Sequence, residues 1–489
     1  MASTFEELMA ERMRKLERLK GAGMDPYPAH VERTHSIGGF LEGFASLERE
    51  GTPVTLDGRV LSVRLHGALA FLDLSDGTGI VQVFAKQNDL AQFDLLVDTV
   101  DMGDFIEVSG TAIVTKTGQH SIAASSWRML AKSLRPLPDA WYGLKDEEER
   151  YRRRYVDILL NEEVSERIKK RSLFWNTIRE YLLTRGFIEV ETPVLENTTG
   201  GADARPFVTH HNALDMDVYL RISAGELWQK KLLVGGLPRV FEIGRIFRNE
   251  GMSREHLQDY TQLEFYMAYA DYRVGMEMIK ELYRLIAEKL FGSQTFTIFE
   301  HTVDLSGDWP IYDFGTVLRE HYGIDPLATT VEEVRAALIK HGIEFDTATL
   351  NVERGVDLLW KKVRKTLSGP GFLIGIPVYL EPLAKRSRDD HRVVERFQVI
   401  LAGSEMGKGF SELNDPVDQR ERFAHQQKLR EAGDDEAHMP DMDFVEALEY
   451  GMPPAFGFGA SERLFSFLMG VDVREGQTFP LMRPRSEES

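Results

Sequence analysis

The sequence predicts an α+β protein in which a small N-terminal β-barrel precedes a larger domain built on an antiparallel β-sheet flanked by helices. Five short runs of alternating apolar and polar residues lie between residues 54 and 130, as expected for the strands of a small barrel. A second pair of strand patterns, 240–243 and 260–266, is separated by a polar loop and predicts an antiparallel hairpin. A long amphipathic pattern from about residue 164 to residue 185 predicts a helix before this hairpin.

Composition restricts the class of protein. With 489 residues the chain is long enough for two or three domains with substantial cores, and it contains no cysteine. A disulfide framework, a thiolate metal site and a cysteine nucleophile are therefore excluded. The charged start of the chain and the lack of a long apolar run predict a cytoplasmic protein with no membrane partner. A net charge of −19 disfavours nonspecific binding to nucleic acid, so an RNA-binding role has to rest on particular residues.

Residues 1–52 are predicted to form an N-terminal helical extension. Apolar residues with helical spacing run from residue 4 to residue 21, and Gly21 and Gly23 end the pattern. The basic residues of this helix could contact RNA, but a solvated face is the simpler interpretation.

Residues 53–135 are predicted to form a barrel of the oligonucleotide-binding (OB) type, with turn signals at Asp76-Gly77 and Thr117-Gly118. Barrels of this type bind single strands by stacking bases on surface aromatic residues beside a positive groove. Because aromatic residues of a barrel face inward about as often as outward, the pattern alone favours a core position for Phe71.

Residues 136–163 are predicted to be a linker and hinge, because prolines are followed there by a dense run of charges. The sequence YRRRY within this run could contact RNA phosphates or form a solvated face between domains. Residues 293–370 alternate helical segments with turns and are assigned to an inserted helical subdomain without a chemical role. Residues 372–483 return to the second domain and include a helix that ends at about Glu431.

The tip of the predicted hairpin carries residues suited to a polyphosphate. Arg248 and Glu250 end its first strand, and Arg254 and His256 follow in the loop. A guanidinium binds phosphate oxygens in pairs and keeps its charge at any working pH, while a ring such as that of Tyr260 can stack on a base. For the hairpin alone, a solvated ion pair between Arg248 and Glu250 is an equally good interpretation, because short motifs match by chance.

Several motifs in one order favour the phosphate-binding interpretation. The hairpin resembles motif 2 of the class II aminoacyl-tRNA synthetases, with Phe-Arg-x-Glu, a loop and a returning aromatic residue. Over nearly the whole chain the sequence is most similar to the bacterial type of the lysyl-tRNA synthetase family. The stretches that carry this resemblance are RYVDILLN, GFIEVETPVLENTTGGADARPFVTHHNALDMDVYLRI, VGGLPRVFEIGRIFRNEG, GFSELNDPVDQRERF, ALEYGMPP and FPLMRP.

The resemblance implies a fold and an activity. Residues 53–135 would bind the anticodon, and residues 164–489 would form a class II synthetase catalytic domain. The expected reaction is the activation of L-lysine by ATP to lysyl-adenylate, followed by transfer of the lysyl group to the 3′ end of tRNA(Lys), with Mg²⁺ as cofactor. The helix and the strand that ends at Pro193 resemble motif 1, which implies a homodimer.

The resemblance also assigns individual residues. The catalytic positions are Arg248, Glu250 and Arg463. The ATP-binding positions are Arg248, Arg254, His256, Tyr260, Glu405, Gly457, Gly459 and Arg463. The lysine-binding positions are Gly201, Glu226, Arg248, Glu264, Tyr266, Lys408, Phe410 and Glu412. The anticodon-binding positions are Arg64, Phe71 and Gln82, and the Mg²⁺ positions are Glu405 and Gln398.

These residue types suit the expected chemistry. The substrate carboxylate attacks the α-phosphorus of ATP in line, so no protein nucleophile is needed, and catalysis comes from orientation and charge cancellation. Arg248 would hold the α-phosphate and the substrate carboxylate, and Tyr260 and Arg463 would enclose the adenine. A dehydrated lysine ammonium has three donors to satisfy, which favours acidic partners such as Glu264 and Glu412.

Five positions depart from the family pattern. Gln398 replaces a glutamate ligand, which predicts fewer or weaker protein-held metal ions. Lys408 replaces an asparagine near the bound amino acid and is expected to help to bind its carboxylate. Ala460 replaces a motif 3 glycine, Ser126 replaces an anticodon-reading glutamate, and one extra residue precedes Glu226.

Three other functions stay open at this point. An aspartate- or asparagine-specific synthetase would need a cation facing the substrate side chain, whereas Glu264 and Glu412 supply carboxylates. A catalytically reduced paralogue that binds RNA or a protein as a regulator is opposed by the retained motif residues, but Gln398 and Ala460 keep it open. A ligase that lysylates a protein is disfavoured by the predicted barrel.

Overall fold

The computed structural model describes residues 4–138, 146–198, 200–201, 204–251, 253–298, 300–347, 350–431 and 439–485. The chain divides into two compact units, Met1–Glu147 and Glu148–Ser489. Residues 139–145, which fall in the predicted linker, lie outside the described residues. Within the described residues, no helix has both the length and the apolar character needed to cross a bilayer.

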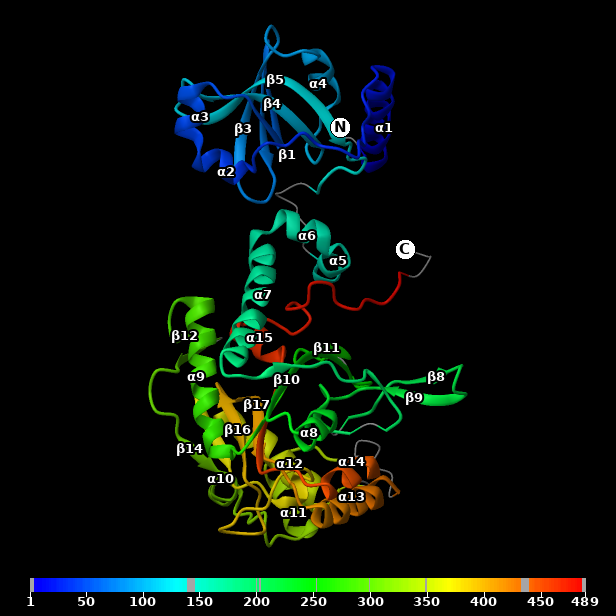
Figure 1. Cartoon of the computed structure of the whole chain (residues 1–489), viewed down its shortest axis with the longest axis vertical. Helices are drawn as coiled ribbons and strands as arrows, with labels where there is room; N and C mark the ends of the chain where they lie inside the picture. The colour runs from blue at the N-terminus through cyan, green and yellow to red at the C-terminus, as the bar shows by residue number, and fades with distance from the viewer. Residues whose placement is uncertain are drawn as a thin grey trace. The chain divides into compact units, whose positions relative to one another are not determined.

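The first unit is a closed five-stranded barrel with the strand order β1-β2-β3-β5-β4 (Figure 1). Its strands are β1 (Val54–His66), β2 (Leu69–Ser75), β3 (Ile80–Lys86), β4 (Phe105–Val114) and β5 (His120–Ala131). Strands β3 and β5 pair in parallel, and the other neighbours pair antiparallel. The five strand runs predicted from the sequence are confirmed.

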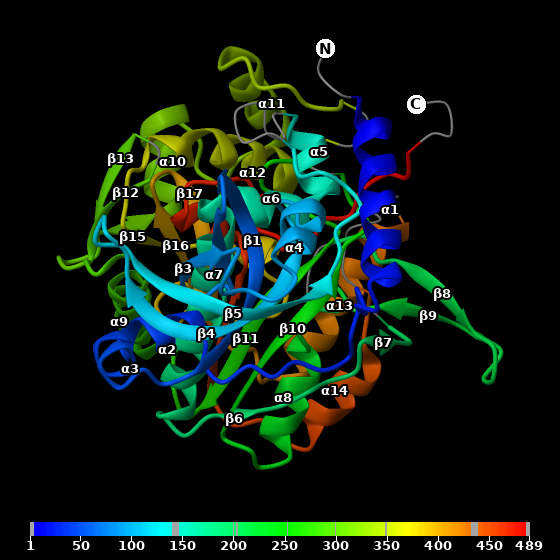
Figure 2. The ribbon, with the colours of Figure 1, turned by 90° about the horizontal axis from the view of Figure 1, so that it is seen from above.

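Four helices cover this barrel: α1 (Phe5–Gly21), α2 (Ile37–Glu42), α3 (Phe44–Glu50) and α4 (Phe93–Thr99). Helix α1 begins with a capping box between Thr4 and Glu7 and packs beside α4 (Figure 2). Its basic residues bind acidic partners of the same unit: Lys15 Nζ lies 2.6 Å from Asp101 Oδ1. This face of the helix is therefore used for packing within the unit.

The second unit is built on one eight-stranded sheet with the order β14-β15-β16-β17-β18-β11-β10-β6. The strands are β14 (Ile311–Asp313), β15 (Gly371–Ile374), β16 (Arg396–Leu401), β17 (Ser404–Ser411), β18 (Ala455–Ser461), β11 (Asp259–Ala268), β10 (Arg239–Phe247) and β6 (Ile188–Glu189). Only the two outermost pairs, β14 with β15 and β10 with β6, are parallel. The predicted α+β class with a mainly antiparallel sheet is confirmed.

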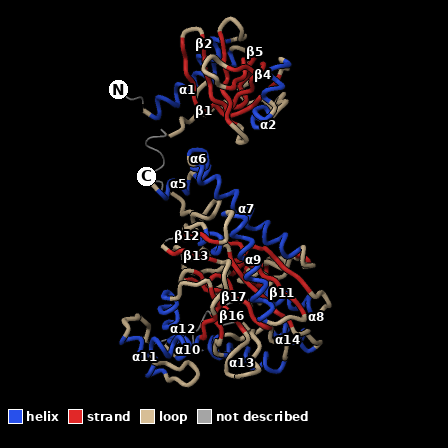
Figure 3. The backbone as a smooth tube through the Cα atoms, turned by 90° about the vertical axis from the view of Figure 1, so that its left-hand side faces the viewer, coloured by secondary structure: helices blue, strands red, loops and turns tan. Residues whose placement is uncertain are grey.

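Helices cover both faces of this sheet (Figure 3). Those outside the insertion are α7 (Glu162–Leu183), α8 (Glu226–Val234), α9 (Tyr272–Phe291), α13 (Pro416–Glu431), α14 (Met442–Glu449) and α15 (Arg463–Leu468). Along β11, Phe265 points into one core with Phe174 of α7, whereas Tyr266 points into the other with Phe444 of α14. The strand therefore presents alternate side chains to two separate cores.

A small three-stranded sheet stands beside this domain. It has the order β7-β9-β8, with β7 (Leu195–Glu196), β8 (Val208–His211) and β9 (Met216–Leu220). Its strands follow the region that resembles motif 1.

The charged run predicted to be a linker is folded. It forms α5 (Glu147–Arg152) and α6 (Arg154–Leu160) in the second unit. Arg154 is fully buried, with Nη1 2.8 Å from Asp157 Oδ2 and Nη2 donating to the carbonyl of Glu475 at 2.6 Å. The prediction of a linker was wrong from residue 147 onward, because this arginine ties the run to the C-terminal segment.

The region 293–370 is not a separate helical subdomain. It contains the hairpin β12 (Thr295–Ile298) and β13 (His301–Asp304), the edge strand β14, and the helices α10 (Phe314–Tyr322), α11 (Val331–Lys340) and α12 (Val352–Val363). Phe314 and Trp360 belong to the same apolar core as Phe410 of β17. The prediction was wrong here because the apolar faces of these helices complete the core of the main sheet.

Candidate active site

Strands β10 and β11 form the predicted hairpin, with residues 248–258 at its tip. On one face of β11, Gln262 Nε2 donates to Glu264 Oε1 at 2.9 Å, and the Tyr266 hydroxyl donates to Glu264 Oε2 at 2.8 Å. The predicted alternation along this strand is confirmed, and its polar face is a connected hydrogen-bond network.

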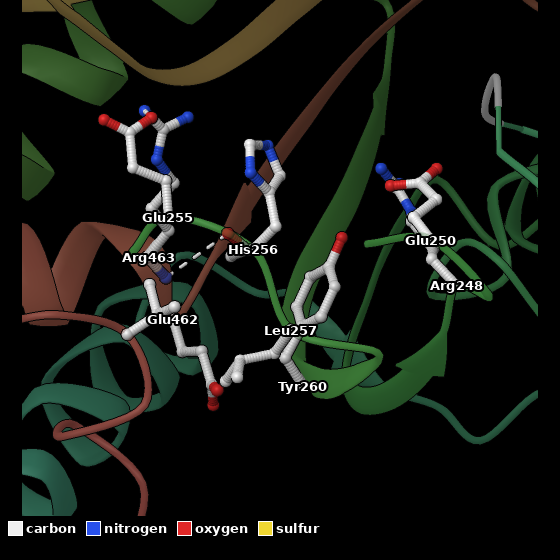
Figure 4. Close-up of a pocket in the computed structure, with 10 residues that line it drawn as sticks. Arg248, Glu250, Glu255, His256, Leu257, Tyr260, Glu462 and Arg463 are labelled. Atoms are coloured by element: carbon white, nitrogen blue, oxygen red, sulfur yellow. Dashed lines mark hydrogen bonds and ion pairs between the residues drawn. The ribbon is translucent and has the colours of Figure 1, made fainter. Parts of the chain in front are cut away.

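A cavity of about 170 Å³, which we call the tip cavity, opens at the end of this hairpin. Its lining residues are Arg248, Glu250, Glu255, His256, Leu257, Tyr260, Ser461, Glu462, Arg463 and Val473. In Figure 4, Arg248 and Glu250 lie on one side of the cavity, Glu255 and Arg463 on the other, and the ring of Tyr260 between them. Two arginines and a ring around one space suit a nucleotide phosphate and base.

A second cavity, of about 230 Å³, lies along the polar face of β11 and is called the strand cavity. Its lining residues are Gly201, Glu226, Arg248, Gln262, Glu264, Tyr266, Lys408, Phe410, Gly457, Phe458 and Gly459. Seven of the eight predicted lysine positions thus line one space, and Glu412 is the exception. Gly457 and Gly459, predicted to bind ATP, line the strand cavity and not the tip cavity.

Arg248 belongs to both cavities. Its Nε donates to the Ile222 carbonyl at 3.1 Å, and its guanidinium lies 5.8 Å from the centre of the Tyr260 ring. The hydrogen bond fixes the guanidinium where the two cavities meet. A group held there can contact ligands in both.

Arg463 is paired with Glu255, a residue of the hairpin tip that was not predicted to be in the site. Burial lowers the pKa of Arg463, while the charges of Glu255 and Glu405 act in the opposite direction. A phosphate entering the tip cavity therefore meets a guanidinium that already has a carboxylate partner.

The tip residues Arg254 and His256 differ in position. Arg254 Nε lies 3.0 Å from both carboxylate oxygens of Asp472, and its side chain is 86% exposed. It does not line the tip cavity, in contrast to the predicted ATP-binding position. His256 does line it, with Nδ1 2.7 Å from Ser253 Oγ.

Glu264 is one of two buried carboxylates that line the strand cavity, with 3% of its surface exposed, and Glu226 is the other. Besides Gln262 and Tyr266, the backbone N–H of Ala224 donates to it at 3.0 Å. Burial raises the pKa of Glu264, and the charge of Glu226 adds to this effect. An ammonium group in the cavity would oppose both effects and stabilise the ionised carboxylate.

Glu412 lies behind the cavity wall and has an internal partner, Lys230 of α8. Lys230 Nζ lies 2.6 Å from Glu412 Oε2 and 2.8 Å from Glu226 Oε1, and all three side chains are buried. Glu412 does not line the strand cavity and pairs with Lys230, so its contact with the substrate side chain stays a prediction. Lys230 was not predicted from the sequence, because a Glu-x-x-x-Lys pair on a helix resembles an ordinary surface pair.

The strand cavity also depends on glycine at 457. A Cβ at this position would lie 2.1 Å from Glu412 Oε1 and 2.5 Å from the Tyr266 ring. Any side chain here would displace Glu412 or Tyr266.

Lys408 belongs to a small charged group at the edge of the strand cavity. Its Nζ lies 3.5 Å from Glu381 Oε1, and Arg396 Nη1 lies 2.9 Å from the same oxygen. Glu381 thus balances part of this positive charge. The rest of the positive charge remains at the edge of the strand cavity, where Lys408 was expected to help to bind the substrate carboxylate.

The two predicted metal positions have different partners. Gln398 is buried, and its Oε1 accepts a hydrogen bond from Arg396 Nη2 at 2.6 Å, so a cation would compete with a guanidinium for this oxygen. Gln398 therefore does not fit a Mg²⁺ ligand. Glu405 fits better: it is partly exposed, one oxygen accepts from Trp360 Nε1 at 2.6 Å, and its charge acts on Arg463. Among the described residues no cluster of three or more His, Asp or Glu side chains could hold a metal.

Two other departures from the family pattern are accommodated locally. Ala460 pairs with Leu263 and packs in the apolar core, so its methyl group is covered by protein. The loop before Glu226 turns at Gly225, whose φ of 78° and close approach to Thr192 both require glycine.

In the first unit, Phe71 lies on the outer face of the barrel. Its neighbours Ala70 and Leu72 are fully buried in the core, and its ring lies 5.4 Å from that of Phe84 on the adjacent strand. The core position favoured by the pattern alone is wrong, because the alternation of β2 turns Phe71 outward. Phe84, also on the outer face, was not predicted.

The other two predicted anticodon residues share this face. Arg64 pairs with Phe71 across β1 and β2, and its Nη2 lies 3.1 Å from Asp73 Oδ1. Gln82 accepts from Ser121 Oγ at 3.1 Å and stands opposite Asp73. Ser126, on β5, is exposed.

The sheet, the hairpin with its two cavities and the separate OB barrel together define a class II aminoacyl-tRNA synthetase. Residues 146–483 match the family described as "tRNA synthetases class II (D, K and N)", and residues 54–130 match "OB-fold nucleic acid binding domain".

Curated relatives extend over nearly the whole chain. A protein of Thermosipho africanus named "Lysine--tRNA ligase" is 42% identical, with 99% of this chain and 97% of the relative covered. One of the same name from Moorella thermoacetica is 43% identical, with 98% and 99% covered. The chain therefore belongs to the lysine–tRNA ligase family.

Proposed function

We propose that this chain activates L-lysine with ATP, releases pyrophosphate, and transfers the lysyl group to the 3′ end of tRNA(Lys). The observation that carries the proposal is the pair of cavities joined at Arg248. One of them holds a buried, hydrogen-bonded carboxylate suited to an ammonium group, and the other holds the arginines and ring suited to ATP.

The first step follows from this arrangement. The lysine ammonium binds Glu264 and the Tyr266 hydroxyl, with the methylenes against Phe410, so that the α-carboxylate reaches Arg248. ATP binds in the tip cavity beside Tyr260 and Arg463. Arg248 then holds the attacking carboxylate and the α-phosphate in register and stabilises the charge of the pentavalent phosphorus. Glu226, beside Gly201, is placed to receive the α-ammonium.

Magnesium, when bound, neutralises the charge of the departing pyrophosphate. Glu405 is the residue that would hold it, with Trp360 fixing one carboxylate oxygen. Trp360 comes from the region that was expected to have no chemical role.

The alternative functions are less well supported. A substrate carboxylate in place of the ammonium would lie against the buried Glu264, an acidic group, which opposes aspartate as substrate. Arg248 and Arg463 line one cavity, as a catalytic protein requires, which opposes a regulator without activity. The aromatic outer face of the barrel supports tRNA over a protein as acceptor.

A homodimer is also proposed. The motif 1 segment presents apolar side chains that are exposed in the single chain, and β6 is an edge strand of the main sheet. These side chains are Leu173, Leu183, Ile188, Val194 and Leu195. A second copy would cover them, and sedimentation equilibrium measures whether it does.

The assay that decides the function is ATP–pyrophosphate exchange with each of the twenty amino acids. Exchange that depends on lysine alone supports the proposal. Exchange with another amino acid, or none with any, would overturn it.

For the barrel, Phe71→Ala should lower aminoacylation and leave lysine-dependent exchange unchanged. The reason is that loss of a base-stacking ring costs about 1–3 kcal/mol of RNA binding. Phe5→Ala, which removes an exposed phenylalanine of α1 in the same unit, is the control and should affect neither activity. An equal fall of both activities in Phe71→Ala would show a structural role instead.

For the metal, Glu405→Gln should shift the Mg²⁺ dependence of exchange to higher concentration, because hard cations lose affinity as ligand charge falls. Gln398→Glu should leave that dependence in place, since a carboxylate at 398 would pair with Arg396. A shift to lower Mg²⁺ concentration in Gln398→Glu would place residue 398 beside the ion and contradict the structure.

A further inference from the structure

Arg364 is a cation that has no part in the reaction described above. It directly follows the last residue of α12, and its Nη1 donates to the Gly403 carbonyl at 3.5 Å, a long and therefore weak hydrogen bond. Its Nε is buried and has no hydrogen-bond partner, and no carboxylate in the described part of the chain forms an ion pair with it. A buried donor without a partner costs free energy, which a bound ligand can offset.

The neighbours of Arg364 connect it to the candidate metal ligand. Trp360 lies four residues earlier, on the same side of α12, and donates to Glu405 Oε1 at 2.6 Å. Gly403 lies in the turn between β16 and β17, two residues before Glu405. Arg364 therefore lies beside the carboxylate that would hold Mg²⁺.

Arg364 is also close enough to Arg463 for the two positive charges to repel each other. Burial lowers the pKa of Arg463, and Arg364 adds to this effect, while Glu255 and Glu405 oppose it. Two guanidinium groups near each other are costly in the free protein. An anion bound between them would remove this cost, and phosphate oxygens suit guanidinium groups in both charge and geometry.

We propose that Arg364 binds the distal phosphates of ATP and the departing pyrophosphate, beside Glu405. This proposal rests on the proposed function. With the α-phosphate at Arg248 and Mg²⁺ at Glu405, the β- and γ-phosphates extend toward Arg364. Because Gln398 is bound by Arg396 and adds no charge, Arg364 supplies positive charge that does not depend on the metal.

The test compares ATP with AMP, which keeps the base, the ribose and the α-phosphate but lacks the groups that Arg364 is proposed to bind. Calorimetry measures the Kd of each in wild type and in Arg364→Met, without lysine. The Kd of ATP should rise about tenfold or more, because hydrogen bonds to charged groups are among the stronger ones. The Kd of AMP should stay unchanged. In the exchange assay, the KM of pyrophosphate should rise and the KM of lysine should not.

A second titration, with EDTA in place of Mg²⁺, separates direct contact from an effect on the metal. If Arg364 contacts the phosphates itself, Arg364→Met should weaken ATP binding at least as much without Mg²⁺ as with it. A loss that appears only with Mg²⁺ would show that the residue acts through Glu405, and would overturn the proposal.

Lys361→Met is the matched control. Lys361 lies on α12 three residues before Arg364, is 60% exposed, and pairs with Asp357 at 2.7 Å. This variant removes the same formal charge and should leave the Kd of ATP unchanged. Arg364→Lys keeps the charge but loses the paired geometry of the guanidinium, so its ATP affinity should lie between those of wild type and Arg364→Met.

Four further results would overturn the proposal: unchanged ATP affinity in Arg364→Met, an equal loss of ATP and AMP affinity, an equal loss of ATP affinity in Lys361→Met, or a failure of both Arg364 variants to fold. If only Arg364→Met fails to fold, the ATP and AMP affinities of Arg364→Lys decide by the same criterion. A wild-type protein that does not bind ATP would instead remove the proposed function, so the two failures are distinguishable.

Discussion

Glu264→Gln is expected to raise the Kd of lysine by two orders of magnitude or more, with little change in the Kd of ATP. Its carboxylate is buried in the strand cavity and is the proposed partner of the substrate ammonium. Leaving a buried charge without its partner costs about 3–5 kcal/mol. Calorimetric titration of each ligand separately measures both affinities.

Tyr266→Phe separates charge from hydrogen bonding at this position. It removes the hydroxyl that donates to Glu264 Oε2 but keeps the ring. The expected loss is smaller, since one hydrogen bond contributes about 0.5–1.5 kcal/mol. If Glu264→Gln binds lysine as wild type does, the ammonium lies elsewhere and the assignment of the strand cavity is wrong.

Arg248→Ala is expected to lower kcat/KM for lysine-dependent pyrophosphate exchange by about 100- to 1,000-fold, the range found when one preorganised donor to a developing negative charge is removed. The guanidinium lies where the two cavities meet, so its loss affects both the attacking carboxylate and the phosphate. Arg248→Lys should recover only part of the rate, because an ammonium lacks the two-pronged geometry of the guanidinium.

Arg245→Ala provides the control for Arg248. Arg245 lies on β10, three residues before Arg248, pairs with Asp259, and is absent from both cavities. Its loss should leave exchange near the wild-type rate. Exchange that falls equally in Arg245→Ala and Arg248→Ala would mean that the hairpin itself had been distorted, and thermal unfolding of both variants would show this.

Local patterns in the sequence were sufficient to predict the strands of the barrel and the hairpin β10–β11. The alternation of Gln262, Glu264 and Tyr266 sets which side chains share a face, because successive residues of any strand point to opposite sides. The motif resemblance also predicted most of the residues that line the strand cavity. They lie close together because they are on neighbouring strands and on the helix that packs against those strands.

Only the tertiary structure decided which charged groups pair with one another. The sequence could not show that Gln398 is bound by Arg396, that Arg463 pairs with Glu255, or that Arg254 is directed to Asp472. These partners are brought together by folding and not by a short repeat, so no periodicity encodes them.

The tertiary structure also decided which side chains are buried. Phe71 and its core neighbours share one apolar pattern, and Glu226 with Lys230 has the spacing of a common surface pair. The sequence by itself determined the barrel strands, the hairpin, the family and most of the residues around the site. The fold decided which of those residues face the substrate and which face each other, because a charge removed from water is stabilised only by the particular groups that surround it.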